Sequence, residues 1–159
     1  MVRFFTMMRR LTGLIALQAL ALVAAASAGD RTAEQARPRV EHHLLEADQI
    51  VRHFESVLAD DCPRLDTAAD RRAYVDSEVD QVVLLVAHLE EAWSEAKHTS
   101  DKDVRRAAKA PRGQLGQAQS LVTKLQTCMG DGGASLEPRA IWRRVEQEVP
   151  RRRAEIALP

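Results

Sequence analysis

Imidazole and carboxylate side chains recur along residues 41–54 (EHHLLEADQIVRHF). His42 and Glu46 are four residues apart, which places them on one face of a helix, and His53 follows farther along the same face. Side chains of these two types suit zinc, copper or nickel ions. One hypothesis from the sequence is therefore a metal site that uses His42, Glu46 and His53.

The spacing along this face limits the metal hypothesis. Glu46 and His53 would be separated by about 10 Å along a helix axis, so a closed site needs a ligand from another helix, such as His88 or Glu91. The face also lies opposite the apolar one, which makes a polar outer surface the simpler interpretation. His43 lies nearer the predicted core boundary and is expected to be packed or partly exposed.

The chain has two cysteines, Cys62 and Cys128. Their separation does not match zinc spacing, and neither belongs to a Cys-x-x-Cys redox motif or a haem-attachment motif. Exported proteins meet an oxidising environment, in which paired cysteines form disulfides. The sequence therefore predicts one Cys62–Cys128 bond, which would stabilise the fold by about 4 kcal/mol in the chain-entropy account.

Residues 1–28 have the pattern of a secretory signal peptide. Three arginines lie at the start, a mostly apolar run follows over residues 11–26, and Ala26-Ser27-Ala28 resembles a cleavage site. An uncleaved anchor is the alternative, but it needs about 20 apolar residues, and no later stretch is long and apolar enough to cross a membrane. The prediction is a single domain over residues 29–159, located in the periplasm or secreted.

The charges are unevenly distributed. The chain has 23 basic and 23 acidic residues; three basic ones precede the predicted cleavage site, which leaves 20 against 23, or a net charge of −3. This is not the composition of a nucleic-acid-binding protein. Residues 66–98 are strongly acidic, whereas residues 102–159 are basic. The simpler interpretation is that an acidic helix packs beside a basic one.

A second interpretation of the basic segment is a surface for an anionic partner, such as lipid head groups, an acidic protein or a cell-wall polymer. Six arginines near the end of the chain would form it. They are Arg139, Arg143, Arg144, Arg151, Arg152 and Arg153.

Apolar residues recur in steps of three and four along four stretches, which predicts four helices. These stretches are residues 38–60, 66–98, 101–129 and the segment after Ser135. Pro38 suits the first turn of a helix, and Ser100 is a plausible N-cap for the third. Pro111 interrupts the third stretch, but the apolar phase is the same on both sides of it. One kinked helix is therefore preferred over two separate helices.

The predicted fold is all-α: an antiparallel up-down four-helix bundle with one kinked helix and a single disulfide. In that topology the first and third helices end at the same pole, which brings Cys62 and Cys128 together. The sequence has no glycine-rich phosphate loop, nucleophile elbow or paired inward carboxylates. We therefore expect no enzymatic activity and no cofactor. The expected function is an exported helical binding protein of the cell envelope, and the alternative is extracytoplasmic metal binding or sensing.

Overall fold

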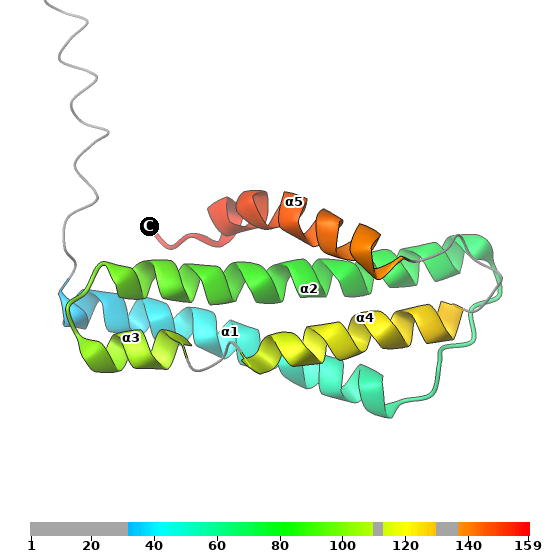
Figure 1. Cartoon of the computed structure of the whole chain (residues 1–159), viewed down its shortest axis with the longest axis horizontal. Helices are drawn as coiled ribbons and strands as arrows, with labels where there is room; N and C mark the ends of the chain where they lie inside the picture. Colours follow the sequence, from blue (N-terminus) through cyan, green and yellow to red (C-terminus); the bar gives the residue numbers. More distant parts are fainter. Residues whose placement is uncertain (1–31, 110–112, 130–136) are drawn as a thin grey trace, which may run out of the picture. The chain divides into compact units, whose positions relative to one another are not determined.

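The computed structural model describes residues 32–109, 113–129 and 137–159. This part of the chain forms five helices and no strand (Figure 1). The helices are α1 (Ala33–Ala59), α2 (Ala68–Lys97), α3 (Lys102–Lys109), α4 (Leu115–Met129) and α5 (Pro138–Ile156). The predicted signal peptide, residues 1–28, lies outside the described residues. None of the described helices has the length and apolar character needed to cross a membrane.

The first helix begins earlier than the sequence predicted. The hydroxyl of Thr32 accepts a hydrogen bond from the amide of Gln35, and the Gln35 side chain accepts one from the amide of Thr32, each at 3.3 Å. This capping box satisfies the first amides of α1. Pro38 then lies inside the helix, where it removes one amide donor without ending the helix. The predicted start at Pro38 was therefore wrong.

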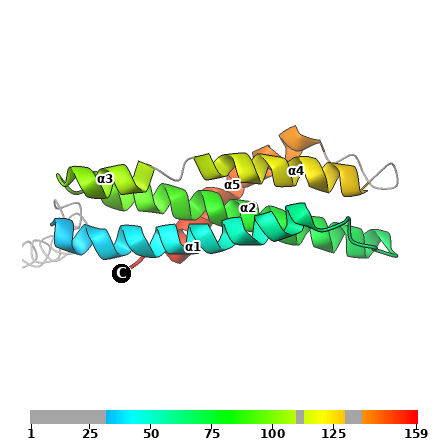
Figure 2. The same cartoon turned by 90° about the horizontal axis from the view of Figure 1, so that it is seen from below.

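Helices α1 and α2 lie side by side along most of their length and make the largest helix–helix interface (Figures 1 and 2). The predicted apolar stripes supply the core between them. The buried members on α1 are Val40, Ala47, Val51 and Phe54. The buried members on α2 are Val75, Val79, Val82, Leu89 and Ala96. Helical periodicity therefore located one buried stripe on each helix, whereas α2 also buries Val83, Leu85, Ala87 and Ala92 outside that stripe.

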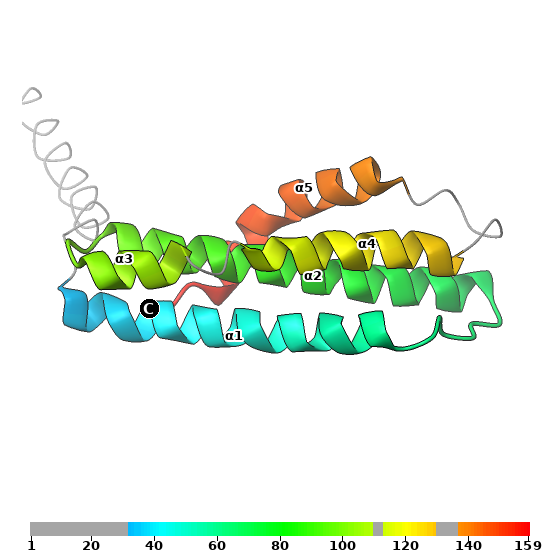
Figure 3. The ribbon, with the colours of Figure 1, turned by 60° about the horizontal axis from the view of Figure 1, so that its bottom comes forward.

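The stretch predicted as one kinked helix forms two helices, α3 and α4. Both pack against α1 and α2, α3 near the start of α1 and α4 near its end (Figures 2 and 3). Pro111 lies outside the described residues. The apolar stripe continues from α3 into α4, as the sequence indicated, because Val104, Ala108, Ala118 and Val122 are all buried.

Asp101, rather than the predicted Ser100, caps α3. Its carboxylate accepts hydrogen bonds from the amides of Asp103 at 2.8 Å and Val104 at 3.1 Å. The hydrogen bond from the Val104 amide, followed by the one from the Asp103 amide, lowers the pKa of the Asp101 carboxyl. The carboxylate of the next residue in the chain reaches the free amides here, and Ser100 is left at the surface.

The end of α1 is joined to α4 by a covalent bond and by a lysine. Cys62 and Cys128 form the predicted disulfide, with their Cα atoms 5.2 Å apart. One turn before Cys128, the Lys124 ammonium donates to the carbonyl oxygens of Val57 at 2.7 Å, Leu58 at 3.0 Å and Asp60. Lys124 thus donates to carbonyl groups at the end of α1, which have no hydrogen-bond partner within the helix.

Helix α5 packs mainly on α2, with a smaller contact to α4 (Figure 3). Ile141, Val145 and Val149 recur in steps of four along this helix and are buried. Pro150 lies inside α5, which continues to Ile156. Pro150 is exposed, so the carbonyl that its ring leaves without a helical donor can bond to water.

Replacement of both cysteines, Cys62→Ser with Cys128→Ser, is expected to lower the free energy of unfolding by about 4 kcal/mol, because the bond closes a loop between residues separated by 66 in the sequence. Urea unfolding followed by far-UV circular dichroism measures the change. The oxidised and the chemically reduced wild-type protein are the matched pair. An unchanged free energy of unfolding in both comparisons would contradict this assignment.

Candidate functional site

The three residues predicted to bind a metal are distributed along α1. His42 is exposed, Glu46 is half-buried, and His53 contacts the buried carboxylate of Glu78 on α2 at 2.9 Å. His42 and His53 are eleven residues apart, which is about 16 Å along the helix axis. Within the described segments, no group of three or more histidine, cysteine or acidic side chains is arranged to hold a metal ion. Metal binding by His42, Glu46 and His53 remains a prediction.

A pair of histidines that the sequence did not predict lies in the α1–α2 interface. His43 is completely buried, His88 is 7% exposed, and their Nδ1 atoms are 3.1 Å apart. The expectation that His43 would be at the core boundary placed it too far outward. The spacing of His43 indicated its burial, because it follows buried Val40 by three residues and precedes buried Ala47 by four.

Burial keeps this pair neutral at pH 7. It lowers the pKa of His43 to about 4, with smaller contributions from His88, His42 and Arg39. Burial also lowers the pKa of His88, an effect that Glu46 partly offsets. Two neutral imidazoles can share one N–H···N hydrogen bond. The Nε2 atom of His43 has no hydrogen-bond partner among the described residues, so the pair carries an unsatisfied buried group.

Further polar contacts join α1 and α2 on either side of this pair. Arg39 reaches Glu95 at 3.5 Å, and His53 reaches Glu78 at 2.9 Å. Residue numbers that rise along α1 are matched by numbers that fall along α2, so the two helices run antiparallel. Arg39 also donates to the carbonyl oxygens of Leu158, at 2.8 Å, and Pro159, which holds the segment after α5 against α1.

Most of the arginines predicted to bind a partner are used inside the molecule. Arg144 contacts Asp76 at 2.5 Å and Asp80 at 3.1 Å on α2, and Glu148 on α5 at 2.7 Å. The hydrogen bond to Glu148, followed by the one to Asp76, raises the pKa of Arg144. The packing of a basic helix beside an acidic one, expected from the charge distribution, is therefore observed.

The last three arginines of the set are also paired. Arg153 contacts Glu91 at 2.6 Å and Glu90 at 3.0 Å on α2. Glu155 on α5 forms ion pairs with both Arg151, at 3.6 Å, and Arg152, at 3.0 Å. Together with Arg144, these pairs account for four of the six predicted arginines.

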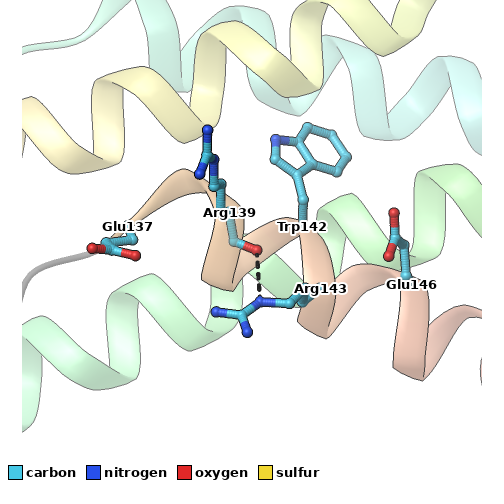
Figure 4. A pocket seen from close by; sticks show the side chains of 5 residues that line it. All are labelled: Glu137, Arg139, Trp142, Arg143 and Glu146. Atoms are coloured by element: carbon cyan, nitrogen blue, oxygen red, sulfur yellow. Dashed lines mark hydrogen bonds between the residues drawn. The ribbon is translucent and has the colours of Figure 1, made fainter.

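Arg139 and Arg143 differ from the other four arginines, because neither forms an ion pair in the part of the chain that the structure describes. Both line a surface hollow of about 540 Å³ on α5, which we call the arginine hollow. Figure 4 shows the side chains of Arg139 and Trp142 pointing to the same side of α5. Arg143 turns back along the helix and donates to the carbonyl of Arg139 at 3.3 Å. Glu137 and Glu146 complete the lining.

A second depression adjoins the arginine hollow. It lies between α2, the start of α4 and α5, has a volume of about 300 Å³, and is called the apolar groove below. Its lining residues are Val86, Glu90, Leu115, Trp142, Val145, Glu146, Val149 and Pro150. Trp142 and Glu146 line both depressions. Trp142 is half-buried against the core cluster.

Comparison of the chain with protein-family models, with curated proteins and with solved structures gave no match. No family is therefore shown for this protein. The functional argument depends on its own residues and on the geometry in which the fold places them.

Stability is expected to fall by about 2 to 3 kcal/mol between pH 6.5 and pH 4.5, because His43 has a folded pKa of about 4 and an unfolded pKa of about 6.5. In that interval the unfolded chain binds a proton that the folded chain excludes, so acid favours unfolding. Urea unfolding of the protein in chelator-treated buffer at several pH values measures the slope.

His43→Leu should flatten this pH dependence, whereas His98→Ala, an exposed position, should leave it unchanged. The pKa of Asp101 is lowered from its ordinary value of 3.8, so its effect on stability falls at lower pH and does not contribute in this interval. An equal slope in wild type and His43→Leu would show that the buried pair does not control acid stability.

Proposed function

We propose that this chain is an exported, non-enzymatic helical protein of the cell envelope that binds a partner through α5, at the surface around Trp142. We also propose that its helices make an up-down four-helix bundle, with α3 and α4 sharing one position. The contacts of both α3 and α4 with α1 and α2 support that arrangement.

Export is supported by two independent features of the chain. Residues 1–28 carry the arginines, apolar run and small-residue site typical of a signal peptide. The Cys62–Cys128 disulfide is the second feature, since such bonds persist in oxidising compartments and are rare in the cytosol. The two features together support the proposed periplasmic or secreted location.

The observation that carries the proposed contact surface is the position of Trp142 between two depressions, beside two arginines with no ion pair among the described residues. Tryptophan and arginine are the residues on which binding energy most often concentrates at protein interfaces. The other four arginines form ion pairs with carboxylates of α2 and α5. They are less available for binding, because a partner would have to displace an existing ion pair. Arg139, Trp142 and Arg143 are the available anchors.

Trp142→Ala is expected to weaken binding of the partner at least tenfold, because truncating a buried interface tryptophan removes an anchor. The mature protein, immobilised and exposed to its own envelope fraction, gives the bound component and its saturation curve. Ala140→Tyr is the second variant. It adds bulk at an exposed position of α5 beside the arginine hollow and leaves the core intact.

Leu45→Ala, at an exposed apolar residue of α1, is the matched control and should bind as wild type does. Circular dichroism and the intact disulfide establish that each variant is folded. If no component binds saturably, or if Trp142→Ala and Ala140→Tyr both bind as wild type, the proposed surface is wrong.

A second candidate function is metal binding at the histidines of α1 and α2. The observation in its favour is the 3.1 Å separation of the Nδ1 atoms of His43 and His88, close to the roughly 3.3 Å between two nitrogens on one tetrahedral zinc ion. The ring of His42 lies 5.3 Å from that of His43, centre to centre. Burial lowers the pKa of His88, and Glu46 is close enough to offset part of that lowering.

Titration of the mature protein with zinc and nickel tests this candidate by calorimetry. Metal binding predicts a micromolar site that His42→Ala and His88→Gln each weaken about tenfold or more, and that the exposed His98→Ala leaves intact. Absence of binding at micromolar metal in the wild type removes the candidate.

A further inference from the structure

We propose that the buried pair of His43 and His88 is an acid-sensitive switch that opens one end of the molecule, while the end that carries the disulfide stays folded. The end that opens consists of the start of α1, the end of α2 and the whole of α3, which lie together (Figure 3). We call it the α3 end. The switch is independent of the proposed binding surface on α5.

The histidine pair lies between two separate clusters of buried apolar side chains. On α1, His43 follows Val40 of a small cluster by three residues and precedes Ala47 of a large cluster by four. On α2, His88 interrupts the apolar residues at the same level, since its ring faces that of His43. The small cluster joins α1, α2 and α3 and consists of Ala36, Val40, Ala92, Ala96, Val104 and Ala108.

The two ends of the molecule are held together to different extents. The small cluster at the α3 end contains four alanines and two valines, and alanine buries little apolar surface. The large cluster contains bulkier side chains such as Phe54 and Leu121, and the Cys62–Cys128 bond closes that end covalently. Local opening therefore costs least at the α3 end, because few apolar contacts and no disulfide oppose it there.

The surroundings of the pair oppose its protonation in the closed state. A ring that gains a proton becomes a buried cation. If both rings are protonated, both Nδ1 atoms, 3.1 Å apart, become donors and can no longer share a hydrogen bond. On α1, Arg39 and His42 add positive charge that acts on His43, whereas half-buried Glu46 adds negative charge that acts on His88.

Charged groups on the other helices do not compensate a proton on the pair. Beyond His88 on α2, Glu91 contacts Arg153 of α5 at 2.6 Å, and Glu95 contacts Arg39 at 3.5 Å. These two carboxylates are thus already engaged by arginines. The charged residues of α3 are exposed, and Lys124, the charged residue of α4, lies at the far end of α1. Protonation therefore adds positive charge to this level of the α1–α2 interface.

The direction of the pH effect follows from burial. Burial lowers the pKa of His43 to about 4 in the closed state, whereas contact with water on opening returns it to about 6.5. Below pH 6.5 the open state binds a proton that the closed state excludes, so acid favours opening. For His43 alone, the opening equilibrium shifts about twentyfold between pH 7 and pH 5. Burial also lowers the pKa of His88, which acts in the same direction.

Hydrogen–deuterium exchange followed by mass spectrometry tests the switch helix by helix. The sample is the oxidised mature protein in chelator-treated buffer at pH 7 and pH 5, with each exchange rate corrected for the intrinsic rate at that pH. Amides of α3 and of the start of α1 should lose protection about twentyfold or more on acidification. Amides of α4 and of the end of α1, next to the disulfide, should change by less than about threefold.

The matched variants remove titrating rings at buried and exposed positions. His43→Gln with His88→Gln leaves two amides that can still hydrogen-bond but do not titrate, so the pH effect at the α3 end should fall below about threefold. His98→Gln is the control, because it removes an exposed histidine at the same end of the molecule and should leave the wild-type effect intact. If the double variant does not fold, His43→Leu replaces it and should reduce the effect by about tenfold.

Three results would overturn the inference. Unchanged protection of α3 in the wild type between pH 7 and pH 5 would show that acid does not open this end. An equal loss of protection in all helices would show that the pair controls global unfolding instead of a local opening. A full pH effect in the variant without the buried rings would assign the acid response to other groups.

Discussion

The antiparallel contact between α1 and α2 is the interaction on which the other helices depend. Helices α3 and α4 each pack on both of these helices, and α5 packs mainly on α2. A slip of α1 against α2 would separate Arg39 from Glu95, His43 from His88 and His53 from Glu78 at once. Apolar side chains tolerate a small slip, but a buried polar group that loses its partner is costly. The polar pairs therefore specify the register within which the valine-rich core packs.

The histidine pair shows the cost of that specificity. A buried imidazole must stay neutral, and His43 does so only with a pKa held near 4 and with its Nε2 atom unsatisfied among the described residues. Replacing buried polar pairs with well-packed apolar side chains often stabilises a protein. We infer that the pair contributes to the alignment of α1 and α2 rather than to the overall free energy of folding.

The arginines of α5 have two different roles. Arg144 and Arg153 attach the helix to the carboxylates of α2, which neutralises much of the acidity of that helix. Arg139 and Arg143 lie nearer the start of α5 and have no such carboxylates to contact in the described part of the chain. The division between structural and available arginines thus follows from where α5 lies against α2, and it limits the surface that a partner can use.

Much of the fold was predictable from local rules. The apolar steps of three and four located the helices and their buried faces, since that spacing makes one stripe on a helix. The disulfide was also predictable, because a helical chain that is predicted to be exported and has two cysteines at helix ends has few other uses for them. The start of α1 and the division of the third stretch were mispredicted, because a capping box at Thr32 outweighs Pro38 and apolar phase alone cannot distinguish one helix from two that follow the same line.

The candidate site was decided by tertiary structure. The sequence by itself determined that the chain is helical, that Cys62 and Cys128 join, and that basic residues gather near the end of the chain. Only the packed structure decided that His43 faces His88 and that four of six arginines contact internal carboxylates. Only packing placed Trp142 between two depressions. The reason is physical: helical periodicity is a property of neighbours in the chain, whereas partners and burial depend on which helices meet and in what register.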